Sequence, residues 1–92
     1  MSSTPNPCAP EAPEAARSRF TVRAVREPSV LSRVVELFVL RDLIPAHVRC
    51  EAGETTILVE LTVDGLDDVQ ANHVAQRIRQ FPTVESVLLA RA

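Results

Sequence analysis

The chain has few aromatic side chains: its 92 residues include three Phe, no Tyr and no Trp. Modules that bind single-stranded nucleic acid stack bases on such side chains, and the net charge of -2 adds no general attraction for phosphates. Binding of nucleic acid is therefore not expected. Glycine is equally scarce, with two residues, so the chain contains neither a P-loop nor a G-x-G-x-x-G phosphate loop.

Cysteines and long apolar runs are also few. Cys8 and Cys50 are too few for a disulfide framework and predict free thiols in a reducing compartment. Neither lies at metal-ligand spacing from His47 or His73, so we expect no metal site, and both histidines are expected at the surface. No apolar run reaches the roughly 18 residues that span a bilayer, and no secretory signal opens the chain. We predict a cytoplasmic protein without a cofactor or a membrane contact.

Proline gathers at the N-terminus, where four of the seven prolines fall within residues 1–17. This segment has few large apolar side chains, so it cannot bury enough surface to offset its ordering entropy. We predict a disordered tail over residues 1–17 and one small domain over residues 18–92. A domain of this size buries a modest core, which makes oligomerisation a common source of further stability.

Hydrophobic periodicity predicts six elements in the order strand, helix, strand, strand, helix, strand. Ser29 is expected to cap the first helix and Pro82 to end the second. The apolar residues of the last strand do not fix which face turns inward. The order is that of the ferredoxin-like fold, an α+β sandwich (βαββαβ) with a four-stranded antiparallel sheet and two helices on one face. The predicted ranges are 19–26, 30–42, 46–51, 55–63, 66–80 and 84–91.

The strand over residues 46–51 is predicted at an edge of the sheet, because it follows Pro45 and alternates apolar with polar side chains. The first helix carries an apolar arc wider than one small sheet requires, which is typical either of a partner surface or of a strongly apolar helix. We expect a second copy of the chain to pair along this edge. The edge residues are Ala46, His47, Val48, Arg49 and Cys50.

The loop between the first strand and the first helix is the main candidate binding site. A strand that ends at a helix N-terminus leaves backbone N–H groups without helical partners, and such a corner suits an anionic or carboxylate ligand. No catalytic set accompanies the loop, because no histidine lies near its serines in the sequence. The acids around residue 67 are expected to favour the start of the second helix. The expected ligand-binding residues are Arg26, Glu27, Pro28, Ser29, Val30 and Leu31.

The segment E-P-S-V-L-S-R-V-V-E-L-F-V-L-R-D-L-I resembles the signature of ACT domains, which are regulatory modules with this order of elements. It is most similar to the short regulatory small subunit of acetolactate synthase, and the resemblance covers residues 20–90. It implies a non-catalytic module that pairs side by side with its own copy and contacts a catalytic subunit, such as acetolactate synthase. The matching positions are Glu27, Pro28, Leu31, Ser32, Arg33, Val34, Leu37, Phe38 and Arg41.

Three positions depart from the family's pattern. Its effector-binding Asn or Asp falls at Arg26, its loop glycine at Ser29, and the glycine after its helix at Asp42. Glycine lets a ligand approach the backbone closely, so these changes weaken the expectation of an amino-acid effector, although Arg26 can pair with a carboxylate. Two alternatives stay open. One is a stand-alone amino-acid-binding ACT domain, and the other is a small ferredoxin-like enzyme, such as a phosphatase, with Arg26 as its anion-binding group.

Overall fold

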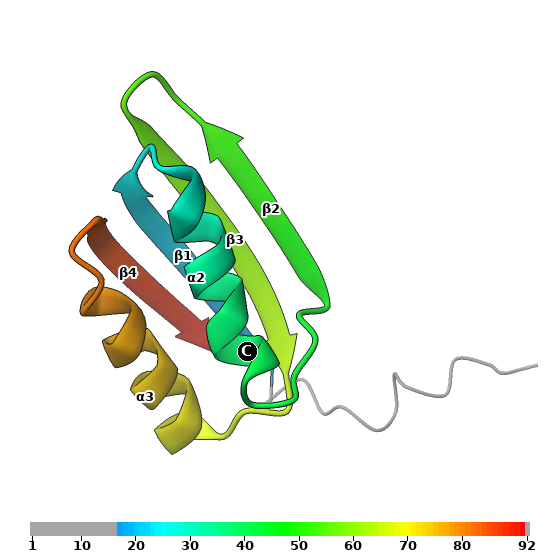
Figure 1. Cartoon of the computed structure of the whole chain (residues 1–92). Coiled ribbons are helices and arrows are strands. Elements are labelled where there is room, and N and C mark those ends of the chain that lie inside the picture. The colour runs from blue at the N-terminus through cyan, green and yellow to red at the C-terminus, as the bar shows by residue number, and fades with distance from the viewer. Residues whose placement is uncertain (1–16, 92) are drawn as a thin grey trace, which may run out of the picture.

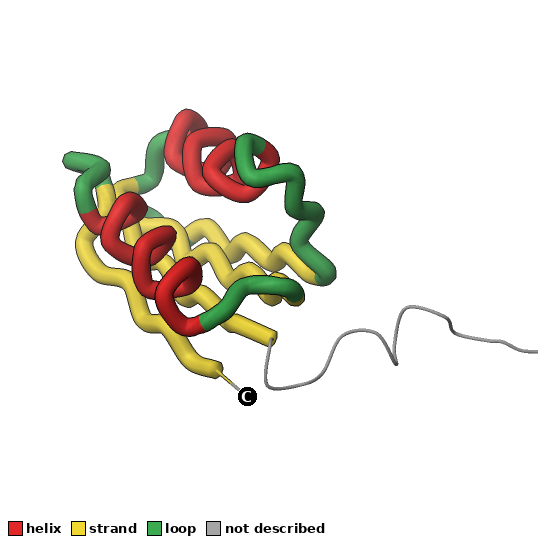
Figure 2. The backbone as a smooth tube through the Cα atoms, turned by 90° about the horizontal axis from the view of Figure 1, so that it is seen from below, coloured by secondary structure: helices red, strands yellow, loops and turns green. Residues whose placement is uncertain are grey.

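A computed structural model describes residues 17–91, which form two layers (Figures 1 and 2). The strands make one antiparallel sheet in the order β2-β3-β1-β4, and both helices lie on one face of it, which confirms the predicted ferredoxin-like fold. The predicted tail lies outside the described residues, except for its last residue, Arg17, which begins β1. The elements are β1 (Arg17–Val25), α2 (Pro28–Val39), β2 (His47–Ala52), β3 (Thr56–Asp64), α3 (Asp68–Arg79) and β4 (Val84–Arg91).

The core lies between the helices and the two central strands. In β1 and β3 every second side chain is buried, as the period-2 pattern predicts. The ring of Phe38 on α2 meets that of Phe20 on β1 edge to face, with centroids 5.3 Å apart. Such a pair contributes about 1 kcal/mol beyond the area it buries. The remaining core side chains of α2 are Val30, Val34 and Leu37.

A β-bulge settles the inward face of β4, which the sequence left open. Val87 pairs with Val22 in regular register, but the register shifts between Arg23 and Ala24, so that Ala24 pairs with Val84. The extra residue returns Val84 to the face of Val87, although the two lie three positions apart and would point to opposite faces in a regular strand. Leu88 therefore lies on the opposite face, 68% exposed.

The two helices start differently from each other, and the prediction that Ser29 caps α2 is wrong. Glu27 is the N-cap, in extended conformation, and Pro28 occupies the first turn. The fixed φ of proline suits that position and its missing N–H costs nothing there, so the helix starts two residues earlier than predicted. In α3, Asp67 accepts from the N–H of Gln70, whose side chain accepts in return from the N–H of Asp67. This capping box replaces the predicted start at residue 66.

Arg91 links β4 to its neighbours. Ser18 on β1 is the one fully buried polar residue within residues 17–91, and its hydroxyl accepts a 2.7 Å hydrogen bond from Arg91 Nη1. The same nitrogen donates to the Leu66 carbonyl at 2.9 Å, and Arg91 Nε lies 2.7 Å from Asp68 Oδ1. One guanidinium thereby joins β1, β4 and the start of α3.

Candidate functional site

The loop at residues 26–31 is tied to the β2–β3 turn by Arg26. Its backbone N–H donates to the Thr55 carbonyl at 3.0 Å, and its guanidinium donates to the Gly53 carbonyl at 3.2 Å. The group expected to meet a ligand carboxylate is therefore engaged with the protein's own backbone. Its bond is exposed, so a competing anion would have to displace only one neutral acceptor.

The start of α2 offers fewer free donors than a helix N-terminus usually does. Pro28 has no N–H, and the N–H of Val30 donates to the Glu27 carbonyl at 3.1 Å. Val30 is 1% exposed and belongs to the core, while Leu31 is half-buried against it. Glu27 is exposed and adds a negative charge at this corner. Of the six predicted ligand residues, the structure thus leaves Arg26, Glu27, Pro28 and Ser29 exposed at the surface.

Asp42 supports the alignment with the ACT signature on geometric grounds. Its φ is +61°, in the left-handed region that glycine adopts freely, and no other non-glycine residue within 17–91 has a positive φ. Asp is among the few side chains that tolerate this conformation. The resemblance places a glycine of the family at this position, and the backbone of Asp42 adopts a conformation that glycine favours.

The predicted edge strand is an edge strand: among the strands of residues 17–91, β2 pairs with β3 alone, and all six of its residues are exposed. Val48 and Cys50 pair with Leu61 and Val59, whose side chains face the core, so they lie on the helix-bearing face. Figure 1 shows β2 beyond α2, which explains why Val48 stays 43% exposed. Three more exposed apolar side chains precede the strand, at Val39, Leu40 and Ile44.

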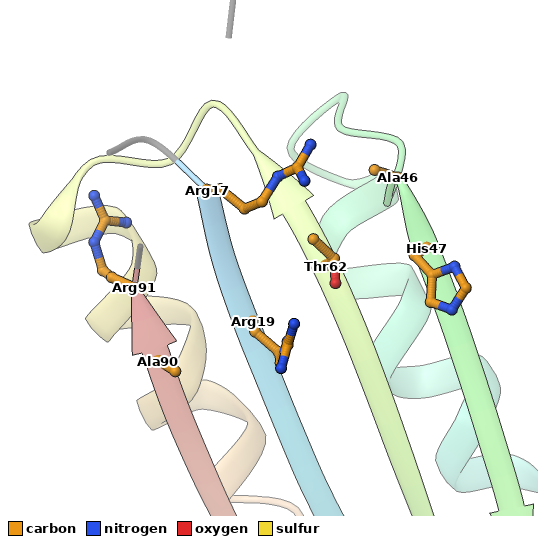
Figure 3. A pocket seen from close by; sticks show the side chains of 7 residues that line it. All are labelled: Arg17, Arg19, Ala46, His47, Thr62, Ala90 and Arg91. Carbon is orange, nitrogen blue, oxygen red and sulfur yellow. The ribbon is translucent and has the colours of Figure 1, made fainter. Parts of the chain in front are cut away.

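The sheet face turned away from the helices, here called the outer face, carries the surface hollows. One, with a volume of about 580 Å³, is lined by Arg17, Arg19, Ala46, His47 and Thr62 together with Ala90 and Arg91 (Figure 3). Two others lie along β2 and β3 toward their hairpin. None of these three hollows is lined by a residue of the 26–31 loop. Sequence patterns indicate outward residues on each strand, but not which of them become neighbours.

One ion pair borders the first of these hollows, which Arg17 helps to line. Arg17 Nε donates to Asp64 Oδ1 at 2.8 Å and Arg17 Nη2 to Asp64 Oδ2 at 3.2 Å, a two-pronged contact between β1 and β3. Those hydrogen bonds lower the pKa of the Asp64 carboxyl below its ordinary value of 3.8. Arg17 is thus already matched with an acid.

The histidine, cysteine and acidic residues that the structure describes are spread over several elements. Residues 17–91 hold no group of three or more His, Cys, Asp or Glu side chains placed to bind an ion. His47 and His73 are both exposed, as predicted. Cys50 is an exposed free thiol, and Cys8 lies outside the described residues. Neither helix of this part of the chain is long and apolar enough to cross a membrane.

Comparison with known proteins agrees with this architecture. The ACT domain from GTP pyrophosphokinase of Chlorobium tepidum superposes with a TM-score of 0.71 at 8% identity, over 80% of this chain and 96% of that one. The C-terminal domain of the MgtC protein from Mycobacterium tuberculosis gives 0.70 at 14% identity, over 86% and 89%. A homoserine dehydrogenase from Thiobacillus denitrificans gives 0.61 at 20% identity, over 85% of this chain but 18% of that enzyme. No curated protein sequence matches significantly.

At these identities the solved structures establish the fold alone. The sequence pattern of the ACT-like domain family, however, matches residues 11–92, which include every element of the sheet and both helices. Fold, element order and sequence pattern agree, and the chain belongs to the ACT-like domain family.

Proposed function

We propose that this chain is a non-catalytic regulatory module that works as a pair of copies joined along β2. The observation that carries the proposal is the exposure of all six residues of β2, on an edge whose helix-bearing face is apolar and uncovered. An exposed edge strand is a template for a further strand, and natural proteins usually protect such an edge. A second copy of the chain would both extend the sheet and cover Val48.

The hydrogen bonds of the hairpin define which groups of β2 are available to a partner. The Gly53 N–H donates to the Thr56 carbonyl at 2.8 Å and continues the ladder of β2, whereas the Ala46 N–H, which donates to the Thr62 carbonyl at 2.7 Å, precedes β2 and falls outside the alternation of that strand. Because bonding alternates along an antiparallel ladder, Glu51 and Arg49 then bond to β3 while Cys50 and its even-numbered neighbours direct their N–H and C=O groups outward.

Charge complementarity favours one register for this pairing. A two-fold axis at Cys50 pairs outward-facing residues with each other and sets Arg49 opposite the second copy's Glu51, on both sides of the axis. In one copy Arg49 Nη2 already lies 2.9 Å from Glu51 Oε2, so the acid and base share the outer face. An axis at Arg49 or at Glu51 would oppose like charges instead, which is unfavourable in a sheet.

The register predicts a specific cross-link. Directly opposed residues of a hydrogen-bonded antiparallel pair have Cα atoms about 5.5 Å apart, within the range that a disulfide spans. In a Cys8→Ser variant, mild oxidation should therefore join two copies through Cys50, and light scattering should give twice the monomer mass before oxidation. A monomer at high micromolar concentration, with no cross-linked species, contradicts the proposal.

The partner of the pair is proposed to be a catalytic subunit of amino-acid biosynthesis. The match of the 27–41 segment to the small subunit of acetolactate synthase supports that enzyme as the first to test, although none of the compared structures is one. Co-purification from the native host with identification by mass spectrometry tests it. Recovery of a different enzyme, or of none, rejects acetolactate synthase.

Binding of an amino-acid effector at the 26–31 loop depends on Arg26 and is tested separately. Its guanidinium would have to leave the Gly53 carbonyl for the ligand's carboxylate. Calorimetric titration with valine, leucine and isoleucine measures this directly. Absence of heat and of any thermal shift supports a purely structural module, whereas binding that disappears in Arg26→Ala supports the amino-acid-binding alternative.

A further inference from the structure

A single row of residues crosses the outer face at the large hollow. His47 on β2 pairs with Thr62 on β3, Thr62 with Arg19 on β1, and Arg19 with Ala90 on β4. Neighbouring strands lie about 4.8 Å apart, so the backbones of Arg19 and His47 are roughly 10 Å apart with Thr62 between them. Figure 3 shows these side chains on adjacent strands. We call His47, Thr62 and Arg19 the anion row.

Arg19 is the strongest feature of the row. It is exposed, and within residues 17–91 its guanidinium makes no hydrogen bond or ion pair, whereas Arg17 is matched with Asp64 and Arg91 is drawn toward α3. Its cross-strand neighbours, Thr62 and Ala90, are short. The N–H groups of a free guanidinium are available to a ligand, and the two short neighbouring side chains leave space for that ligand beside them.

The donors of the row come from three strands. The guanidinium offers a planar fork of N–H groups, the Thr62 hydroxyl can donate one proton, and a neutral imidazole at His47 has one N–H. Three donor groups on adjacent strands can serve the separate oxygens of a tetrahedral oxyanion, which has more oxygens than a carboxylate. Ala46 and Ala90 line the same hollow and leave room for the rest of a ligand.

Acidic residues do not occupy the row itself. Asp64 lies in the next row toward the end of β3 and is bound by Arg17. Glu60 lies in the next row toward the start of β3, where it pairs in register with Arg49 and Thr21. An arginine therefore stands beside each acid nearest to the row. Arg19 adds a positive charge that no described acid contacts.

We propose that the anion row binds the phosphate group of a small metabolite, on the face opposite to the family's effector loop. The hollow of about 580 Å³ is within the size range of small-molecule sites. The site is complete in one copy and leaves the outward backbone groups of β2 free, so it does not depend on the pairing proposed above.

The experiment is an NMR titration of the backbone amides at constant ionic strength, with inorganic phosphate, glycerol 3-phosphate and acetate as probes. Both phosphates should give saturable shifts centred on Arg19, Thr62 and His47. Arg19→Gln should weaken phosphate binding about tenfold, because a charge-assisted hydrogen bond is lost, and Thr62→Val should weaken it several-fold. Circular dichroism verifies the fold of each variant.

Arg23 provides the matched control. It lies on the same strand and face, is exposed, and makes no hydrogen bond or ion pair within the described residues, but its neighbours are Leu58 and Ser86, without a histidine in the row. Arg23→Gln should change the affinity less than about twofold. Equal losses in the Arg19 and Arg23 variants would indicate diffuse counterion binding and overturn the site. Acetate that binds as tightly as phosphate would overturn the assignment to phosphate.

Discussion

The two edges of the sheet, β2 and β4, differ in what protects them. Beside β4 lies α3, whose Arg79 donates from Nη2 to the Val87 carbonyl at 2.9 Å, and Arg91 binds β4 to β1 and to the start of that helix. Within residues 17–91, β2 lies beyond α2, and all six of its residues are exposed. Side chains thus protect one edge from pairing, while the other stays able to accept a strand.

This difference separates two tasks within a small domain. The arginine side chains around β4 are partly buried and hydrogen-bonded to neighbouring elements, so their loss should lower the free energy of unfolding. Groups along β2 are exposed, so their change should leave folding nearly intact and alter association instead. Variants at the two edges therefore should affect different measurements.

The largest effect is expected at the protected edge. Arg91→Ala removes the donor to Ser18 Oγ and to the Leu66 carbonyl and breaks the contact with Asp68. It leaves a buried hydroxyl without that partner, so the free energy of unfolding should fall by about 2–3 kcal/mol. Urea denaturation measures it, with exposed Arg23→Ala as the control, which should cost less than about 0.5 kcal/mol. Equal losses in both variants would show that Arg91 does not hold the β4 edge.

The second effect concerns the open edge and should appear in association alone. Cys50→Pro removes an N–H that the hairpin ladder directs outward, and proline is tolerated on edge strands. The dissociation constant of the pair should rise at least about tenfold, since a strand-to-strand bond is lost and the ring obstructs a second. Light scattering over a dilution series measures it.

The control for this prediction lies on the other edge. Leu88→Arg changes an exposed apolar residue of β4 on the outer face and should leave the dissociation constant unchanged. If Leu88→Arg dissociates the pair and Cys50→Pro does not, the interface lies at β4 or on the outer face, and the comparison of the two edges is wrong.

The sequence predicted the alternating strands well because a half-buried strand has a strict period of two. β1 and β3 follow that pattern along their whole length. The face of β4 could not be predicted, since the bulge opposite Arg23 and Ala24 is a property of two strands together. Capping by Ser29 failed because Pro28 suits the first turn of the helix better than the position before it.

The candidate sites were predictable to different degrees. Pro45 and the polar alternation after it were enough to place β2 at an edge. The 26–31 loop was recognised from its motif, but the bond from Arg26 to Gly53 joins residues 27 apart and has no local signal. The anion row requires the register of two strand pairs, so Arg19, Thr62 and His47 could not be grouped from the sequence.

The stability of the protected edge also depends on the N-terminal cap of α3, and the loss of that cap should have a smaller effect on the free energy of unfolding. Asp67→Ala removes the capping box with Gln70 and should lower the free energy of unfolding by about 1 kcal/mol. Glu27→Ala at the start of α2 should change it by less than about 0.3 kcal/mol, because the Glu27 side chain makes no capping bond. Thermal unfolding of the two variants compares them, and equal destabilisation would contradict the assignment of the caps.

The smallest effect lies between the edges, where Arg17 and Asp64 join the ends of β1 and β3. Their side chains are 49% and 28% exposed, so solvent screens the pair and Asp64→Asn should cost only about 0.5 kcal/mol at neutral pH. The pKa of Asp64 is lower in the folded protein than its ordinary 3.8, so the pair stabilises the fold above that pH and loses its contribution as the pH falls further.

Below that range a protonated Asp64 resembles asparagine, and the difference between Asp64→Asn and the parent chain should vanish. Urea midpoints at about pH 7 and at the lowest pH at which the protein stays folded measure this convergence. A difference of the same size at both values would mean that the shape of the side chain, and not its charge, is what matters there. In that case the stability of the sheet would rest on the bonds around Arg91 still more than the comparison of the edges already implies.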